Sequence, residues 1–426
     1  MRALRGSLLP LLVCACLGPP LVRAEEQPQA PFEYVWARAY EVMPETYNQE
    51  GGYFSLCEGL DGRIYIGTCK HNVNAYLVQF DPQTEQQRIA LDANEACTLS
   101  AVGFAAQAKI HTRNFVAASG AIYVGTMQDY ADAGDASQYP GGYVLRYDPQ
   151  TDRAECLGMP CPGEGIADVA ADEARGLVYV ITAGKWRWMV ADLRTRRYRE
   201  IGPPLAPFSA TVVDGRGRAN ALTAKLELAQ HDPDAGKTTV RPITVHGTRL
   251  SPGDAAPVPT WRIDPDGHRT WMILLNDPTL IEIELSGEAP AAQATSHGKM
   301  IEGRNPDSRC ALGIGPDGRI YAVVRIDNET GFGGGFLHHL VRFDPQTGRA
   351  EDLGVIAVQN PDYFDFGPGP DGRPKPWAHG FQTLPDGTLT PLHAHMAMIV
   401  ARDGTIYVTV LSPFTLLRIP QLAGVR

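Results

Sequence analysis

Short runs of β-branched and aromatic residues recur along this chain, and each run follows a turn signal. The sequence Asp-Gly-x-Ile-Tyr occurs at residues 61–65, 317–321 and 403–407, with a weaker copy at residues 119–123. Asp-Gly favours the positive φ of a tight hairpin turn, because glycine has no Cβ to clash there. Ile, Tyr, Val and Thr favour the pleated strand that follows. Each copy therefore predicts a turn that leads into a β-strand.

A second repeated piece, an aromatic residue followed by Asp-Pro-Gln-Thr, alternates with the first. It occurs at residues 80–84, 147–151 and 343–347. Proline fixes φ near the value that the first central position of a turn requires. Each unit then contains four strands, joined by an Asp-Gly turn, a variable loop and an Asp-Pro turn. Such an antiparallel meander is one blade of a β-propeller.

The repeats predict an all-β fold, a seven-bladed β-propeller. The inner strands are expected to begin near Gly52, Thr112, Gly165, Phe208, Thr260, Arg309 and His395. The last unit supplies only three strands, whereas residues 32–42 form a spare strand. If this N-terminal strand pairs as the fourth strand of the last blade, the ring closes and both open edges disappear. Two separate sandwich domains are the alternative, but the repeat is regular and no linker interrupts it.

The first residues have the features of an export signal. Two arginines precede an apolar run at residues 8–17, and a small-residue cleavage site ends at Ala24. This run is too short to span a bilayer, and no later run is longer. We therefore expect a signal peptide at residues 1–24 and a single β-propeller domain at residues 25–426, secreted or periplasmic. A lipoprotein modified at Cys16 is the alternative.

Composition and charge narrow the choice of partners. The chain of 426 residues contains 44 Gly and 34 Pro, which fits many short strands joined by turns. The net charge is −10, and no run of Lys and Arg occurs, so we expect no nucleic-acid partner. The sequence also lacks Gly-x-Ser-x-Gly, a phosphate loop and a dinucleotide fingerprint.

Six cysteines remain after the expected cleavage, which permits disulfides in an exported chain. They are Cys57, Cys69, Cys97, Cys156, Cys161 and Cys310. Cys156 and Cys161 are close in sequence and are the favoured pair, while Cys57 and Cys69 lie on strands expected to be adjacent. The sequence alone leaves the pairing open. Because no Cys-x-x-Cys occurs, we expect no structural zinc.

Two kinds of loop meet on one face of a propeller beside its central channel, and these loops carry the candidate site. One kind leads into each inner strand, and the other joins the second and third strands of a blade. The residues expected near these loops are Lys70, His71, His111, Arg113, Asn114, Tyr143, Trp186, Arg309, Arg325, His393 and His395. Polar residues in such a run are costly to bury without partners, so we expect them at the channel mouth.

The predicted mouth is cationic and aromatic, although the whole chain is acidic. Aromatic faces cover sugar rings, and Arg pairs a carboxylate through two parallel hydrogen bonds. The expected partner is therefore an anionic oligo- or polysaccharide. A β-elimination at a uronic acid uses all of these groups, because a cation acidifies the C5 proton and His or Tyr removes it. His393 and His395 share one face of an extended segment and could hold a divalent metal such as Mn, Ca or Zn.

The two repeated pieces, the export signal and the histidines expected at the channel mouth resemble those of the β-propeller polysaccharide lyases, such as oligogalacturonate and ulvan lyases. The resemblance implies β-elimination of glycans that contain uronic acid. It implies that His111 and Tyr143 act as base or acid. It also implies that Arg113 and Arg309 neutralise the uronate. The residues expected to hold the substrate are Lys70, His71, Asn114, Trp186 and Arg325.

The sequence departs from the resemblance in one place and leaves two other functions open. Oligogalacturonate lyases hold their metal with several His and a Gln, but here Thr390 stands three residues before His393. One alternative is a non-catalytic propeller that binds carbohydrate or protein. The other is a metal-dependent hydrolase or lactonase of the calcium-bearing propeller type. That type would need Glu, Asn and Asp at the channel, and the expected loops offer Glu164 and Asn114.

Overall fold

The computed structural model describes residues 28–48, 51–128, 138–252, 257–373, 375, 378–393 and 397–422. The predicted signal peptide and His395 lie outside these ranges. Within them the chain is built from β-strands, with a few 3-10 turns and one short α-helix, α1 (Ala93–Cys97). No helix in this part of the chain is long and apolar enough to cross a membrane.

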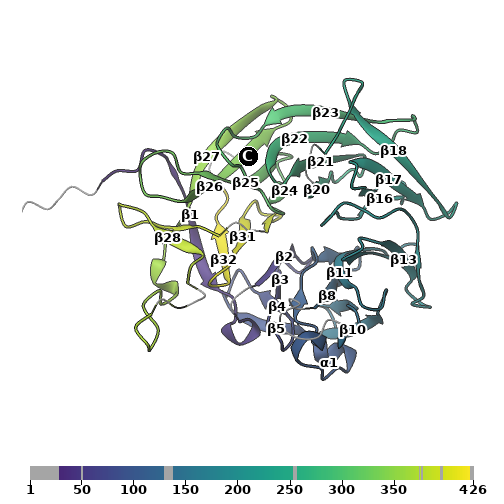
Figure 1. The fold of residues 1–426 in the computed structure, drawn as a ribbon, viewed down its shortest axis with the longest axis horizontal. Helices are drawn as coiled ribbons and strands as arrows, with labels where there is room; N and C mark the ends of the chain where they lie inside the picture. Colours follow the sequence, from purple (N-terminus) through teal and green to yellow (C-terminus); the bar gives the residue numbers. More distant parts are fainter. Residues whose placement is uncertain are drawn as a thin grey trace, which may run out of the picture.

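Antiparallel meanders follow one another around a ring, as predicted (Figure 1). The first three groups of strands are β2 (Gly51–Glu58), β3 (Ile64–Thr68), β4 (Tyr76–Phe80) and β5 (Gln87–Asp92); β6 (Lys109–Ile110), β7 (Phe115–Val116), β8 (Ile122–Met127), β9 (Val144–Asp148) and β10 (Arg153–Gly158); and β11 (Gly165–Asp172), β12 (Leu177–Ala183), β13 (Trp188–Asp192) and β14 (Tyr198–Glu200). The next two groups are β15 (Val212–Val213), β16 (Ala219–Leu222), β17 (Glu227–Asp232) and β18 (Lys237–Val245), with β19 (Thr248–Arg249) beside β18; and β20 (Pro259–Ile263), β21 (Arg269–Leu274), β22 (Asp277–Glu284) and β23 (Ala292–Lys299). The last two groups are β24 (Leu312–Ile314), β25 (Ile320–Asp327), β26 (Phe336–Asp344) and β27 (Arg349–Val358); and β30 (Met398–Val400), β31 (Ile406–Val410) and β32 (Thr415–Ile419).

Strand pairing joins neighbouring parts of the ring at two places in the described chain. β18 pairs in parallel with β23, from Ile243 opposite Ala292, and β27 pairs in parallel with the N-terminal strand β1 (Tyr34–Glu41). The strands therefore join into one sheet of nine and one of eight. Hydrogen bonding thus does not divide the ring into separate blades. The expected all-β fold is present, and the count of seven blades stays a prediction.

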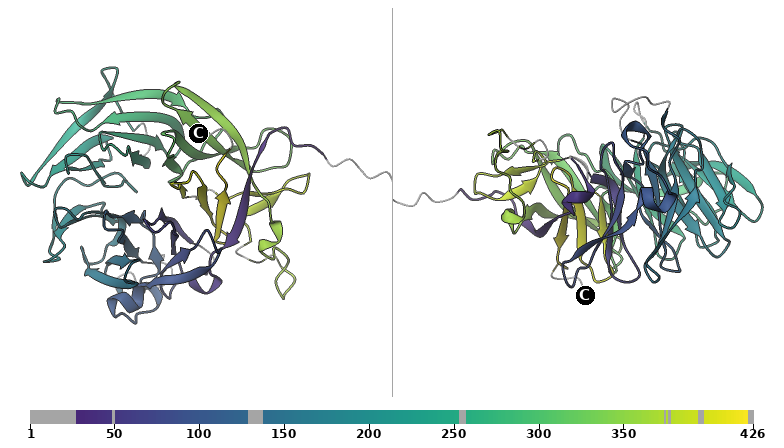
Figure 2. Two further views of the ribbon diagram at one scale, coloured as in Figure 1. Left: turned by 180° about the vertical axis from the view of Figure 1, so that it is seen from behind. Right: turned by 90° about the horizontal axis from the view of Figure 1, so that it is seen from below.

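The N-terminal strand closes the ring, as predicted. The second half of β1 pairs antiparallel with β32, with Arg38 opposite Arg418 and Glu41 opposite Thr415. Figure 2 shows β1 in purple between the green and yellow strands of the chain's last third. Asn360 strengthens this junction, because its side chain accepts a hydrogen bond from the Ala39 N–H at 2.8 Å and donates one to the Ala39 carbonyl at 3.0 Å.

The repeated Asp-Gly-x-Ile-Tyr motif forms a turn that its own tyrosine fastens. Gly62 has a φ of 78°, a conformation that a side chain would strain. The Tyr65 hydroxyl, on the following strand, donates to Asp61 at 2.8 Å. Tyr321 donates to Asp317 at 3.0 Å in the same way. The motif therefore combines a turn former, a strand former and a hydrogen bond across the turn.

A hairpin outside the meanders covers part of β26. It consists of β28 (Phe381–Thr383) and β29 (Leu389–Pro391), within the long connection between β27 and β30. The His338 ring is buried beneath it, and its Nδ1 lies 3.0 Å from the Pro391 carbonyl oxygen. Because a carbonyl only accepts, this Nδ1 carries the proton. The next residue, His339, points to the opposite face, where its Nδ1 lies 2.9 Å from Asp352.

The preferred cysteine pairing from the sequence, Cys156 with Cys161, is wrong. Cys156 Sγ lies 2.6 Å from Cys97 Sγ, whereas Cys161 Sγ lies 3.8 Å from the Pro162 carbonyl oxygen. β10 is irregular between Cys156 and Gly158, and Gly158 has a φ of 97°. The chain therefore changes direction between the two cysteines, which proximity in sequence did not reveal.

The first prediction concerns ring closure. We expect Asn360→Ala to lower the free energy of unfolding by about 1–3 kcal/mol, because both hydrogen bonds to Ala39 are lost where the chain ends meet. Denaturant unfolding of the purified protein measures this change. Gln346→Ala, in an exposed turn, is the matched control. Equal stability of the two variants would contradict a role for Asn360 in closure.

The second prediction concerns acid stability. Burial lowers the pKa of His338 to about 3, whereas an unfolded histidine titrates near pH 6.5. Between these values the unfolded chain binds one more proton than the folded chain, so stability falls as the pH decreases through this window. We expect His338→Asn to remove up to about 1.4 kcal/mol per pH unit of that slope between pH 6 and pH 4.

Unfolding free energies measured at several pH values give the slope for this second prediction. His268→Asn, at an exposed position, is the control. An unchanged slope in His338→Asn would mean that the buried ring does not control the acid transition.

Candidate anion-binding site in the central channel

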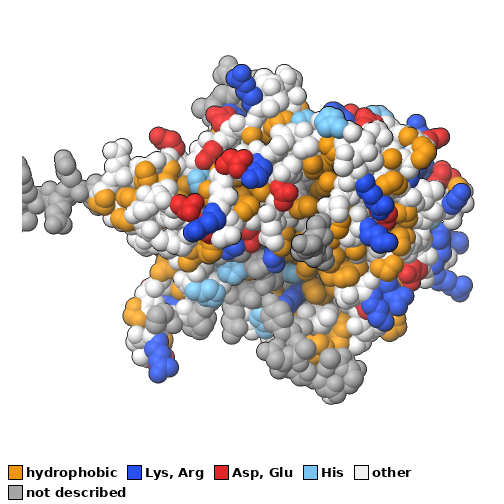
Figure 3. Space-filling view, turned by 45° about the horizontal axis from the view of Figure 1, so that its top comes forward, with side chains coloured by type: hydrophobic (Ala, Val, Ile, Leu, Met, Phe, Trp, Pro, Cys, Tyr) orange, Lys and Arg blue, Asp and Glu red, His pale blue; other side chains and the backbone are white. Residues whose placement is uncertain are grey.

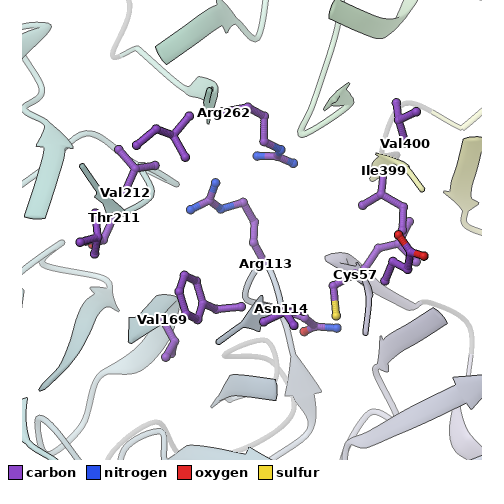
Figure 4. Close-up of a pocket in the computed structure, with 15 residues that line it drawn as sticks. Cys57, Arg113, Asn114, Val169, Thr211, Val212, Arg262, Ile399 and Val400 are labelled. Carbon is purple, nitrogen blue, oxygen red and sulfur yellow. The ribbon is translucent and has the colours of Figure 1, made fainter. Parts of the chain in front are cut away.

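A cavity of about 430 Å³ lies where the inner strands meet at the centre of the ring (Figure 4). Most of its wall is apolar and comes from β2, β7, β11, β15, β20 and β30. The apolar residues include Leu56, Val169, Val212, Ile263, Ile399 and Val400. The polar lining residues include Arg113, Asn114, Thr211, Arg262, Glu58 and Cys57. The cavity therefore combines a mostly apolar wall with a smaller set of polar and charged side chains.

A bulge in the inner strand places residues 111–114 beside the channel. Ile110 pairs with Thr126, and Phe115 pairs with Tyr123. Residues 111–114 of the inner strand thus lie opposite only residues 124–125 of β8. Such bulges change the direction in which side chains point. Gly125 allows close packing here, because a Cβ at this position would overlap the Ile166 side chain and lie 2.9 Å from that of Thr112.

A second bulge places the buried Asp168 beside Arg113. Ile166 pairs with Thr182 and Asp168 with Ile181, so the inner strand β11 has one extra residue at this level. The Asp168 carboxylate is buried, and it accepts hydrogen bonds from the Thr211 N–H at 2.7 Å and from Arg113 Nε at 3.2 Å. Asp168 therefore ties the neighbouring inner strand and Arg113 to β11.

Two guanidinium groups, Arg113 and Arg262, lie close together at the cavity (Figure 4). Both donate to the same carbonyl oxygen, that of Trp261, from Arg113 Nη1 at 3.3 Å and from Arg262 Nη1 at 3.0 Å. Arg113 is paired with Asp168. Glu58 also lines the cavity, so its charged groups are two cations and, with Asp168, two anions. The two guanidiniums lie next to each other, and this local cationic centre is where an anionic group would bind.

The surroundings of the two arginines perturb the neighbouring titrations. Burial, and then the positive charge of Arg113, lower the pKa of Arg262 to about 10, so it stays charged at neutral pH. Burial raises the pKa of Asp168, against the opposing effect of Arg113. Burial also raises the pKa of Cys310 to about 11, although Arg262 and Arg113 lower it. The shifts arise mainly from burial of these groups and, after that, from the charges of the two arginines.

An aromatic group brings together residues from three loops that the sequence analysis had selected. The His111 ring lies 4.9 Å from the Phe54 ring and 6.3 Å from the Phe208 ring. Phe208 in turn lies 5.1 Å from Trp186 and 5.3 Å from Phe54. His111 belongs to the same bulge as Arg113. Figure 3 shows several histidine side chains close together near the middle of one face of the molecule.

Lys70, His71 and Asn114 make contacts that stabilise the fold. Lys70 Nζ donates to the Glu45 carbonyl at 2.8 Å, and the His71 N–H donates to the Asn48 side chain. Neither residue lines the cavity. Asn114 does line it, but its amide also donates to the Tyr65 carbonyl at 3.1 Å and accepts from Ser55.

Tyr143, Arg309 and Arg325 do not line the cavity either. Tyr143 packs in the apolar cluster that contains Cys97 and Cys156. Arg325 Nη2 donates to Asp307 at 3.0 Å, and its guanidinium lies 4.1 Å from the centre of the Phe336 ring. Arg309 is close enough to lower the pKa of Asp307, which burial raises. Of the predicted site residues, Arg113 and Asn114 therefore line the cavity, whereas Tyr143, Arg309 and Arg325 lie elsewhere in the ring.

The predicted metal pair is only partly described. His393 lies with its ring 6.1 Å from that of His379, and His395 falls outside the described residues. Among the described side chains, no group of three or more His, Cys, Asp or Glu residues could hold a metal ion. A divalent metal at His393 and His395 therefore stays a prediction.

The sequence analysis missed three parts of the channel site: Arg262, Asp168 and the Phe54–Phe208 contact. For the two charged residues a signal was present, because each interrupts an apolar strand, Pro259–Ile263 for Arg262 and Gly165–Asp172 for Asp168. A charge on an innermost strand is costly to bury without a partner, so it marks the channel. The aromatic contact had no comparable signal.

Comparisons with known proteins agree with the ring of meanders. No protein-family model and no curated protein matches the chain. A catalytically inactive variant of virginiamycin B lyase from Staphylococcus aureus, solved with quinupristin, is similar over 91% of this chain and 99% of its own, with a TM-score of 0.53 and 11% identity. The RRP9 WD40 repeats cover the same shares, with a TM-score of 0.52 and 8% identity.

A third solved structure, the Cps50 (Swd1) β-propeller domain of Myceliophteria thermophila, has a TM-score of 0.51 and 10% identity. It covers 87% of this chain and 96% of that domain. Identities this low show a common fold and nothing about activity. The chain is therefore a β-propeller protein, and its chemistry has to be argued from its own side chains.

Proposed function

We propose that this protein is an exported propeller lyase that binds an acidic sugar chain at its central channel and cleaves it by β-elimination. The observation that carries the proposal is the pair of guanidiniums, Arg113 and Arg262, which lie close together at the central cavity (Figure 4). A carboxylate between them would accept charge-assisted hydrogen bonds from both sides. The cavity volume of about 430 Å³ lies within the range typical of small-ligand sites.

The chemistry follows from neutralising that carboxylate. A uronate held by the two arginines has a more acidic C5 proton, because charge that develops on the carboxylate is stabilised. His111, on the same bulge as Arg113, removes the proton. The C5–H electrons then form the C4=C5 double bond, the C4–O glycosidic bond breaks, and the leaving oxygen takes up a proton. Trp186, beside Phe208, offers a face for a neighbouring sugar.

The other candidate residues take smaller parts in this proposal. Lys70 and His71 would meet sugars that extend beyond the channel, as would Arg309 and Arg325. Tyr143 receives no catalytic part, because it packs beside Cys97 and Cys156. No step uses a metal at His393 and His395.

A non-catalytic binding propeller is the second candidate. The supporting observation is that the cavity wall is mostly apolar and includes no histidine or tyrosine among its lining residues. The calcium-type hydrolase receives less support, because Glu164 is already engaged by Thr182 and by Arg187 at 3.1 Å. Asn114 is likewise engaged in bracing β2 and β3.

The third prediction tests the arginine pair. We expect the purified mature protein to raise the ultraviolet absorbance of an unsaturated uronate on at least one of a panel of uronate polymers and oligomers. On that substrate, Arg262→Gln should lower kcat/KM by about 10²–10³-fold, because one of the two groups that bind the carboxylate is lost. Arg194→Gln, at an exposed turn, is the matched control. An equal loss in both variants would contradict a specific role for Arg262.

The fourth prediction separates catalysis from binding. We expect His111→Gln to lower kcat by about 10²–10⁴-fold while substrate binding, measured by calorimetry, changes little, because the proton acceptor is removed and the arginines remain. Full turnover in His111→Gln would exclude His111 as the base. Binding by the parent protein without any double-bond product across the panel would favour the binding propeller instead.

A further inference from the structure

Two cysteines that the proposed function does not use lie in direct contact. Cys97 is the last residue of α1, and Cys156 lies on β10, 59 positions further along the chain. Their sulfur atoms are 2.6 Å apart. Both side chains are partly buried and pack against the same apolar cluster between the β2–β5 and β7–β10 meanders. Tertiary structure has therefore brought two thiols together from different meanders.

We propose that Cys97 and Cys156 form a disulfide in the mature exported protein. The direct contact between their sulfur atoms carries the proposal. Cys57 and Cys310 are buried at the channel, and Cys69 lies beside His71. This pairing is independent of the lyase proposal, because neither cysteine lines the channel cavity.

The surroundings of the pair favour oxidation. The Cys97 thiol donates to Cys156, and the Gly158 N–H and the positive charge of Arg196 also stabilise the Cys156 thiolate. These contacts lower the pKa of Cys156 to about 7, while the same contact and burial raise the pKa of Cys97. In the proposed reaction Cys156 is the attacking sulfur, and Cys97, which is in direct contact with it, is the resolving one.

The reaction needs an external oxidant, a disulfide of the dithiol-oxidase or small-molecule class found in export compartments. The Cys156 thiolate attacks one sulfur of that disulfide and forms a mixed disulfide, and the other sulfur leaves as a thiolate. The Cys97 thiol loses its proton and attacks Cys156 Sγ. The Cys97–Cys156 bond forms, and the oxidant leaves as a dithiol with the two protons and two electrons that the protein has lost.

With the disulfide, both ends of α1 would be held in place. At its first end, Asp92 caps the helix by accepting from the Glu95 N–H at 3.0 Å, and Asn74 donates to the same carboxylate at 2.7 Å. At its last end, the disulfide would join α1 to β10 of the next meander, which lies beside it in Figure 1. The chain then continues from Cys97 to the bulge at residues 111–114. The cross-link would therefore anchor the segment that leads into the channel site.

Mass spectrometry of the full chain, exported through its own N-terminus, tests the pairing. The protein is denatured without reductant, its free thiols are alkylated, and it is digested. We expect a peptide pair joined through Cys97 and Cys156 that separates on reduction, whereas Cys161 should be alkylated before reduction. Separate alkylation of Cys97 and Cys156, or a peptide that links Cys156 to Cys161, would overturn the proposal.

Thermal unfolding gives a second readout with a matched control. A disulfide stabilises by restricting the unfolded chain, so we expect Cys97→Ser with Cys156→Ser to lower Tm by roughly 3–8 °C. Cys161→Ser should leave Tm and the joined peptide unchanged. A reductant should lower the Tm of the parent towards that of the double variant. If the reductant does not alter the parent's Tm, the cross-link does not stabilise the fold.

Discussion

The pairing of the first strand with the last is the constraint on which the remaining structure depends. A chain of meanders has two open edges, and each would present unpaired N–H and C=O groups. β1 removes both, because it pairs with β32 on one side and with β27 on the other. The central cavity exists only in the closed ring, since its wall includes both β2, near the start of the chain, and β30, near its end.

Closure also creates the electrostatic character of the channel. Inner strands converge on one axis, so a charged side chain on any of them lies near those on the others. Arg113 and the Trp261 carbonyl that it contacts are 148 positions apart in sequence. A mostly apolar wall strengthens the interaction of Arg113 with Asp168 and those of both arginines with any anion that enters. The acidic net charge of the whole chain therefore says little about the charge of this site.

The candidate site was only partly readable in the sequence because bulges decide where the residues point. The repeat register selected the segment with His111, Arg113 and Asn114; Arg113 and Asn114 line the central cavity, whereas His111 packs beside Phe54 and Phe208. It could not reveal that Asn114 braces the neighbouring strands, or that Tyr143 packs beside two cysteines. Two extra residues before Phe115, and one before Asp168, change which side chains face the axis. Such changes in register depend on neighbouring meanders rather than on local propensity.

The sequence by itself determined the strands, their turns and the closing role of the N-terminal segment. These features arise from short-range sterics: glycine at positive φ, proline at a fixed φ, and β-branched residues in strands. Tertiary structure decided which distant side chains meet, such as Arg113 with Arg262 and Cys97 with Cys156. Those meetings follow from packing between meanders and from ring closure. Residues that are neighbours in sequence, such as Cys156 and Cys161, can be held apart by a bulge between them.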